Sequence, residues 1–182
     1  MKPIGPLMWE HRLIEQIVPL MQKEIRDIQG SKRADVVFIE QAVDFFRTYT
    51  DRTHHGKEEE ILFKELEKKP LSPDHERILK ELMKEHVYAR DNVKGLVQSG
   101  QRYNEGNVEA LGDIVTHLNN LIALYPGHIE KEDKAFFFPV MDYFTPEEQN
   151  KMLAEFYEFD RKMIHEKYQG IMEQLGANVR RW

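Results

Sequence analysis

Cysteine is absent from the 182-residue sequence. This absence excludes disulfide bonds, catalysis by a thiolate and metal sites that are ligated by cysteine. The chain also has no apolar run near the ~18 residues that a membrane-spanning helix needs, and its first residues lack the apolar core of a signal peptide. From these absences we expect a cytoplasmic protein with no membrane partner.

Basic residues are outnumbered, with 26 Lys and Arg against 32 Asp and Glu, which gives a net charge of −6. An acidic balance disfavours binding to nucleic acid or to an anionic membrane surface. Charged residues make up 32% of the chain, which is typical of helices with solvated faces. The length predicts one domain that is large enough to bury a substantial core.

The spacing of apolar residues predicts five amphipathic helices. The first two cover about residues 6–29 and 34–67, the third begins at Ser72, the fourth covers about 107–141 and the fifth begins at Thr145. Turn signals at 30–34, 69–73 and 104–107 separate the first four helices. We therefore expect an all-α fold: an up-down-up-down four-helix bundle over residues 1–144 and an additional amphipathic C-terminal helix, residues 145–182, that packs on the same domain.

Four histidines are spaced in agreement with this bundle. Positions 11, 55, 86 and 128 are separated by 44, 31 and 42 residues, and the midpoints of these intervals fall in the three turn signals. Residues at equal distances from a turn lie level with each other on antiparallel helices, so the four side chains can meet. Glu59 and Glu132 each follow a histidine by four residues and therefore share its helix face. Imidazole and carboxylate ligands without thiolate suit iron, manganese or zinc, and the sequence predicts a dinuclear metal site.

The second helix leaves the register of this site open. The apolar residues before the motif lead to His54 with Glu58, whereas those after it lead to His55 with Glu59. Periodicity alone does not choose between the two pairs. The competing interpretation is a set of ordinary core histidines and exposed pairs. It is disfavoured because Glu132 continues an apolar stripe, and a buried carboxylate needs a charged partner.

The remaining histidines are not expected to bind the metals. His75 and His117 lie eleven residues before the third-helix and fourth-helix histidines, which is about 16 Å along a helix axis and toward opposite ends of the bundle. His165 has no ligand-like partner nearby in the sequence. We interpret all three as structural or exposed side chains.

The motifs around the site histidines resemble those of the hemerythrin-like HHE cation-binding family. The matching segments extend over about residues 6–141 and are Glu10-His11, His54-His-Gly-Lys-Glu-Glu-Glu-Ile-Leu-Phe63, Glu85-His86 with Arg90, and Tyr125-Pro-Gly-His-Ile-Glu-Lys-Glu-Asp133 with Phe138-Pro139. The resemblance implies a non-haem centre of two iron ions with an oxo or hydroxo bridge, for which zinc or manganese could substitute. It places the metal ligands at His11, His55, Glu59, His86, His128 and Glu132.

One position departs from the oxygen-carrying members of that family, which have a further histidine four residues after the third-helix one. This chain has Arg90 at that position. The carriers hold three histidines on one iron and two on the other, so the resemblance implies an open position on both irons here. Asp133 is an alternative acidic ligand to Glu132, because some carriers have the acid five residues after the histidine.

The resemblance implies a protein that binds or reacts with oxygen, nitric oxide or peroxide at the bundle core. The alternative is a non-enzymatic oxygen carrier, iron store or sensor, and the sequence does not decide whether the protein is an enzyme. Trp9, Tyr49, Arg90 and Tyr125 are candidates to line the pocket, although packing or ion pairing is the favoured explanation for each. The C-terminal helix is either a fifth core element or the face of a homodimer.

Overall fold

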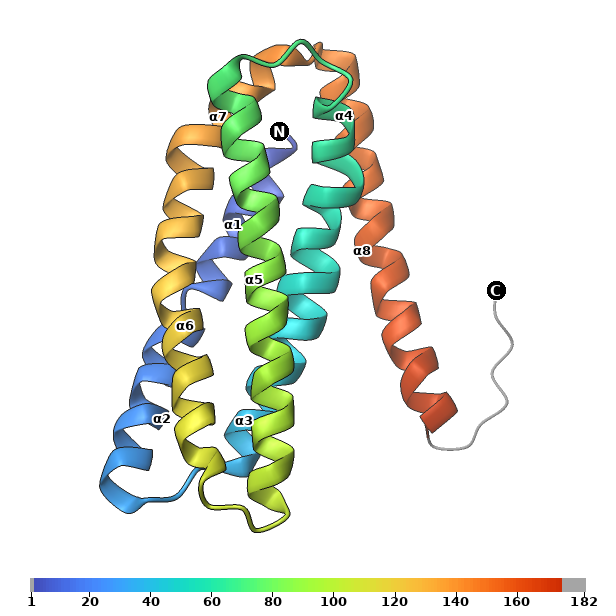
Figure 1. The fold of residues 1–182 in the computed structure, drawn as a ribbon. Coiled ribbons are helices and arrows are strands. Elements are labelled where there is room, and N and C mark those ends of the chain that lie inside the picture. The colour runs from blue at the N-terminus through green and yellow to red at the C-terminus, as the bar shows by residue number, and fades with distance from the viewer. Residues whose placement is uncertain (1, 175–182) are drawn as a thin grey trace.

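The computed structural model describes residues 2–174, which are helical along almost their whole length (Figure 1). Four helical segments run antiparallel, and a fifth helix follows them. This arrangement confirms the predicted all-α bundle with an additional C-terminal helix. The three connections of the bundle lie at the turn signals that the sequence indicated.

Most of the segments combine more than one helix. The first consists of α1 (Ile4–Ile14) and α2 (Ile17–Ser31), and the third is α5 (Pro73–Asn104) alone. The second consists of α3 (Val36–Asp44), the π-helical η1 (Phe45–His55) and η2 (Glu58–Phe63), and α4 (Lys64–Leu66). The fourth consists of α6 (Ala110–Glu130), the π-helical η3 (Lys131–Phe136), α7 (Phe137–Val140) and the 3-10 turn η4 (Met141–Tyr143). The additional helix is α8 (Pro146–Gln174).

Local sequence signals explain several helix ends. The Ser72 side chain accepts a hydrogen bond from the backbone N–H of His75, with proline at the first helical position of α5. Thr145 and Glu148 form the expected capping box, because each side chain accepts from the backbone N–H of the other. The break between α1 and α2 lies at residues 15–16, four positions before Pro19. A proline ring clashes with the carbonyl four residues earlier, so Pro19 accounts for this break.

Two apolar clusters form the core and leave the histidine level between them. The first contains Leu7, Leu62, Leu82 and Phe136, and the second contains Ile14, Phe46, Ala89 and Leu121. On each helical segment the site histidines therefore have apolar neighbours toward both ends of the bundle. Full burial of such a side chain stabilises the fold by roughly 1.5–3 kcal/mol, and the two clusters together hold the site in an interior with little access to water.

Helix α8 packs on the second helical segment close to the histidines. A Cβ atom at Gly56 would lie 2.7 Å from a ring carbon of Phe159, so the glycine permits this close approach. Lys57 is fully buried and pairs with Glu10 and, at 2.7 Å, with Asp160 of α8. Removal of one member of a buried ion pair leaves an uncompensated charge, so α8 is tied to the bundle at this point.

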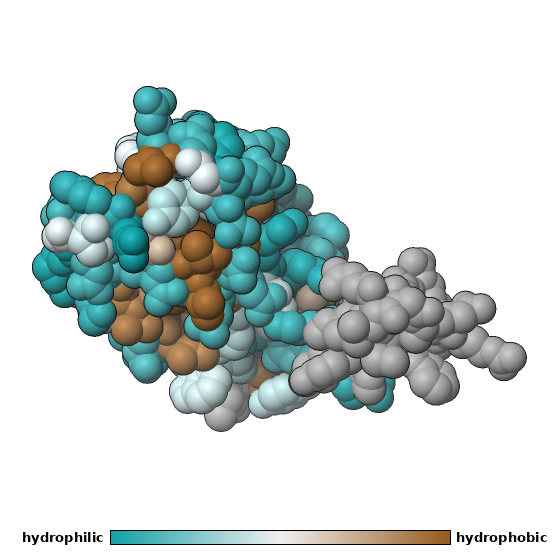
Figure 2. Space-filling model, turned by 90° about the horizontal axis from the view of Figure 1, so that it is seen from below, coloured by the Kyte–Doolittle hydropathy of each residue, from teal (hydrophilic) through white to brown (hydrophobic). Residues whose placement is uncertain are grey.

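Most of the residues on the face shown in Figure 2 are hydrophilic. Seen from the end that carries the α2–α3 and α5–α6 connections, hydrophobic side chains gather between hydrophilic ones (Figure 2). Val37 and Val108 lie at this end and are exposed. Among the described residues, no helix has the length and apolar character needed to cross a lipid bilayer.

Candidate metal centre

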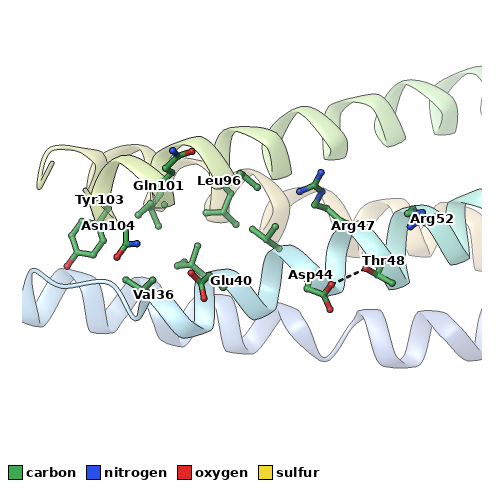
Figure 3. Close-up of a pocket in the computed structure, with 15 residues that line it drawn as sticks. Val36, Glu40, Asp44, Arg47, Thr48, Arg52, Leu96, Gln101, Tyr103 and Asn104 are labelled. Carbon is green, nitrogen blue, oxygen red and sulfur yellow. Dashed lines mark hydrogen bonds between the residues drawn. The ribbon is translucent and has the colours of Figure 1, made fainter. Parts of the chain in front are cut away.

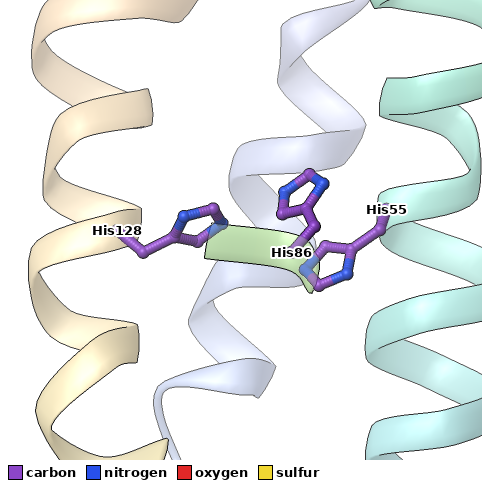
Figure 4. A group of neighbouring side chains, drawn as sticks. All are labelled: His55, His86 and His128. Carbon is purple, nitrogen blue, oxygen red and sulfur yellow. The ribbon is translucent and has the colours of Figure 1, made fainter. Parts of the chain in front are cut away.

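Two groups of buried side chains meet at one level of the bundle, and each has the composition of a metal site. The three-histidine group is His55, His86 and His128 (Figure 4). The two-histidine group is His11, His54, Glu58 and Glu132. Within each group the candidate ligand atoms lie within 4.8 Å of one another.

The structure brings together five of the six side chains that the resemblance placed at the metals, namely His11, His55, His86, His128 and Glu132. Glu59 lies outside both groups and is partly exposed, and Glu58 is buried in the position expected for it. His54 joins the two-histidine group. The second helical segment therefore contributes three inward groups where the sequence analysis expected two, while the binding of metal by these atoms stays a prediction.

The π-helical backbone of η1 and η2 explains this register. Hydrogen bonds between residues i and i+5 put more residues into each turn than the 3.6 of an α-helix, so adjacent side chains are separated by a smaller angle. His54 and His55, at the end of η1, are therefore both buried toward the core. Glu59, which the sequence analysis placed among the ligands, bonds instead to His86 Nδ1 at 2.7 Å, and the carboxylate within the two-histidine group is that of Glu58. The sequence contains a signal for this register, because two adjacent histidines are followed by three adjacent glutamates at 58–60.

Four of the histidines have a carboxylate at Nδ1. The pairs are His11 with Asp133 at 2.7 Å, His54 with Glu10 at 2.9 Å, His86 with Glu59 at 2.7 Å and His128 with Glu85 at 2.8 Å. A carboxylate accepts the hydrogen of the Nδ1 that faces it, which leaves a lone pair on Nε2 and fixes the ring orientation. Metal-bound imidazoles in proteins almost always have a partner of this kind. Asp133, the alternative ligand, therefore positions His11 and lies outside both groups.

Two of these carboxylates come from the Glu-His dipeptides of α1 and α5. Glu10 precedes a site histidine of its own helix but bonds to His54 on the second segment. Glu85 in the same way bonds to His128 on the fourth segment. Neighbouring α-helical side chains point about 100° apart, so the histidine faces the core and the glutamate faces the adjacent helix. Sequence reasoning missed this role, because it depends on which helices are neighbours in space.

Glu58 and Glu132 each lie between the two groups. Glu58 Oε1 is 3.4 Å from His54 Nε2, and Glu58 Oε2 is 3.5 Å from His86 Nε2. Glu132 Oε2 is 3.1 Å from His11 Nε2 and 3.4 Å from His128 Nε2. Each carboxylate thus has one histidine of each group as its neighbour, which is the placement that a carboxylate bridging two metal ions requires.

The central polar atoms have no hydrogen-bond partners among the described residues. Both carboxylate oxygens of Glu58 and of Glu132, together with Nε2 of His86 and of His128, are buried and unpaired. Buried polar groups in native proteins are almost always satisfied, and unpaired buried carboxylates are costly. Metal–ligand bonds of about 2.1 Å at right angles place ligand atoms about 3 Å apart, close to the separations found here. The donor set therefore fits a pair of metal ions, and its nitrogen and oxygen atoms suit iron, manganese or zinc.

The pKa values reflect this concentration of buried ionisable groups. Burial and the nearby charge of Glu132 raise the pKa of Glu58 well above its usual range. Burial lowers the pKa of both His54 and His55. Burial also opposes protonation of His11, but its contacts with the carboxylates of Asp133 and Glu132 outweigh that effect and raise its pKa to about 9. A positive charge is thus favoured between these carboxylates, as expected at a cation site.

Arg90 occupies the position where the carriers have a further histidine, and it forms an ion-pair fork. Its Nε donates to Asp51 at 2.7 Å, and its terminal nitrogen donates to Glu59 at 2.7 Å. Glu59 in turn accepts from His86, so Arg90 helps to orient a histidine of the three-histidine group. With His54 and His55 both inward, the structure brings five histidines together, where the sequence analysis named four and left the choice between His54 and His55 open.

The other candidate residues divide between the site and the rest of the bundle. Tyr125 is buried and lines a cavity beside His55, as Arg90 does. Trp9 is 70% exposed and does not belong to the lining of this cavity. Tyr49 stacks on a neighbouring phenylalanine, and burial raises its pKa to about 12.

The remaining histidines lie away from both groups where the structure describes them. His75 bonds to the hydroxyl of Tyr143 at 2.8 Å, and His117 bonds to Asn92 at 3.2 Å. Both contacts join neighbouring segments, which supports a structural role. The side chain of His165 lies outside the described residues.

An antiparallel four-helix bundle whose interior carries histidines and carboxylates at one level belongs to the class of cation-binding helical bundles. A family model for the hemerythrin HHE cation-binding domain matches residues 3–139. The chain belongs to this family, and the resemblance stated from its motifs is confirmed. Comparisons with curated proteins and with solved structures gave no match.

Proposed function

We propose that the chain is a non-haem di-iron protein that binds or reacts with oxygen, nitric oxide or peroxide in the bundle core. The two-histidine group would hold one ion through His11 and His54, and the three-histidine group would hold the other. Glu58 and Glu132 would bridge the two ions. Iron in this position would supply a redox-active Lewis acid, with zinc or manganese as substitutes.

The observation that carries this proposal is the position of the two unpaired carboxylates between the two sets of histidines. Glu58 and Glu132 each contact one histidine from either group at 3.1–3.5 Å. A single cation in the two-histidine group would leave Nε2 of His86 and of His128 without a partner. Two ions with shared carboxylates would satisfy the unpaired oxygens of Glu58 and Glu132 and the unpaired Nε2 atoms of His86 and His128 together.

The unequal histidine count indicates where a small molecule would bind. Two bridging carboxylates give the three-histidine ion five protein ligands and the two-histidine ion four, so the second ion has more room for an outside ligand. The surroundings of His11 are apolar, since its ring stacks on Phe137 and its helix neighbours Leu7 and Ile14 are buried. Such walls favour an uncharged diatomic molecule over water.

The same count favours reversible binding as the second candidate function. Three histidines on one ion and two on the other is the distribution that the resemblance assigns to oxygen carriers. In this chain the third histidine of the larger group would be His55, supplied by the π-helical segment, in place of a residue one turn after His86. This chain would therefore have as many histidine ligands as the oxygen carriers, although Arg90 stands where they have a histidine.

Metal analysis combined with anaerobic mixing tests this proposal. The iron-reconstituted protein should contain two iron ions per chain and show the near-ultraviolet bands of a coupled ferric pair. After reduction, a carrier should form an oxygen adduct that disappears under vacuum, whereas an enzyme should consume oxygen, nitric oxide or peroxide over many turnovers. One ion or fewer per chain after reconstitution would rule out the dinuclear centre.

A further inference from the structure

A cavity of about 440 Å³ lies between η1 and α5, beside the three-histidine group. Phe46, Val93 and Tyr125 form apolar walls, and His55 belongs to the lining. Small-molecule sites usually have volumes of about 300–1,000 Å³. One water occupies about 30 Å³ of liquid, so the cavity has far more room than a diatomic molecule or peroxide needs.

Positive charge lines the same cavity. Arg47 and Lys94 belong to its lining and are exposed, and neither has a carboxylate within ion-pair distance in the part of the chain that the structure describes. Arg90 and Asp51, which also line it, pair at 2.7 Å, and the same guanidinium pairs with Glu59 at 2.7 Å. The cavity thus has two unpaired cations next to apolar walls, although the chain as a whole has a net charge of −6.

A larger groove of about 610 Å³ adjoins this cavity and shares Arg47 and Val97 with it (Figure 3). The groove is lined by Glu40 and Asp44 as well as by Arg47, and none of the site histidines belongs to its lining. Its mixed charges select no particular ligand. The smaller cavity has one sign of uncompensated charge and reaches His55, so the chemistry of a binding site is found there.

We propose that the 440 Å³ cavity binds an amphipathic organic monocarboxylate. The carboxylate group would bond to Arg47 and Lys94, because charge-assisted hydrogen bonds to an anion are the strong ones. The apolar chain would lie against Phe46 and Val93 and end near His55. The ligand would then be held beside the proposed metal centre and not on it, and its binding does not require that the metals be present.

Isothermal titration calorimetry of the full-length protein with decanoate tests this site. We expect saturable binding of one decanoate per chain, with weaker binding of decanol and of decyltrimethylammonium. The double variant Arg47→Gln/Lys94→Gln should raise the dissociation constant for decanoate at least tenfold. The matched control Arg26→Gln/Lys84→Gln removes two exposed positive charges elsewhere on α2 and α5 and should leave the dissociation constant unchanged.

A second variant tests the apolar part of the cavity. Val97 is half-buried in its lining, and Val97→Trp should fill the space and abolish the binding of decanoate and decanol alike. Circular dichroism would show whether this variant folds; if it does not, the comparison of the two double variants decides. Three results would overturn the proposal. They are equal affinities of the two double variants for decanoate, undiminished binding to folded Val97→Trp, and the absence of binding heat.

Iron content is to be measured in the same samples. A protein that holds two iron ions but no decanoate overturns the carboxylate site alone. A protein that binds decanoate but no metal overturns the proposed di-iron function alone.

Discussion

The second and third helical segments of the bundle both contribute to the site, but they differ in helix type. α5 is α-helical over its 32 residues and directs one side chain, His86, into the centre. The second segment contains η1 and η2 and directs three, His54, His55 and Glu58. Adjacent side chains lie about 100° apart on an α-helix and closer in angle on a π-helix. A local change of helix type can therefore bring an additional candidate ligand to the centre.

The largest expected effect separates Glu58 from Glu59. Glu58→Ala removes a carboxylate that lies between the two histidine groups, so the iron content should fall from two ions per chain to one or fewer. Glu59→Ala removes only the partner of His86 Nδ1, and such changes cost about 10–100-fold in metal affinity. Metal content after equilibrium dialysis measures both. If Glu59→Ala lost the metals and Glu58→Ala kept them, Glu59 would be the ligand, as the sequence analysis expected.

Individual replacement of His54 and His55 tests whether both adjacent histidines bind metal. His54→Ala should weaken the binding of the ion in the two-histidine group. His55→Ala should weaken the binding of the ion in the three-histidine group, so each variant should lose about one of the two ions. His117→Ala, a histidine outside both groups, is the control and should retain both. Iron titration followed by absorbance would detect the loss. Retention of two ions by either of the first two variants would show that only one of the adjacent histidines is a ligand.

The metal-free protein should become less stable as the pH rises from about 6.5 to 9. His11 has an ordinary pKa of 6.5 in the unfolded chain, and its contacts with Asp133 and Glu132 raise it to about 9 in the fold. The protonated form therefore stabilises the fold fully below pH 6.5, and this contribution is lost as the pH passes through 9. The loss is on the order of a few kcal/mol. Urea unfolding of chelator-treated protein measures it, and the decline should be smaller in His11→Gln. Equal declines in both proteins would contradict the raised pKa.

A smaller effect is expected at the contact between the second segment and α8. Gly56→Ala would place a methyl group 2.7 Å from Phe159, and overpacking of this kind costs roughly 1–3 kcal/mol. Gly112→Ala is the control, because nothing lies within 4 Å of its added Cβ, and it should stabilise α6 by up to about 1 kcal/mol. Thermal unfolding measures both. Equal melting temperatures would show that α8 yields easily at this contact.

The smallest effect is expected at Arg90. Arg90→Lys keeps the charge but loses the planar fork that bonds to Asp51 and Glu59 together. Because Arg90 acts on His86 only through Glu59, we expect a loss in iron affinity of less than about tenfold, smaller than the loss on removing Glu59 itself. Competition with a chelator would measure it. A complete loss of one ion would show that Arg90 does more than orient a neighbour of the site.

Much of the fold could be predicted from local patterns. Apolar periodicity, the Ser72 and Thr145 caps and the three turn signals indicated five helices, and the spacing of the histidines indicated that His11, His86 and His128 lie at one level. These features depend on interactions within a few residues along the chain, which the sequence displays directly. The motifs also indicated the hemerythrin HHE family.

The candidate site could be predicted only as far as α-helical spacing holds. That spacing is valid for His11 on α1 and His86 on α5, and for His128 with Glu132. It is not valid across η1 and η2, where the choice between His54 and His55 assumed that only one could face inward. A π-helical turn is rare and is found frequently at functional sites. The surrounding structure therefore decides where it forms.

The sequence by itself determined the helices, their order and the types of donor atom at the centre, because amphipathic periodicity and turn chemistry are local properties of the chain. The tertiary structure decided the register of the second segment and the carboxylate that faces each histidine Nδ1. Glu10 and Glu85 bond to histidines of other segments, and Asp133 crosses from the fourth segment to His11. Such pairings depend on which helices are neighbours in space and on their rotation about their axes. Those relations are fixed only when the whole core packs.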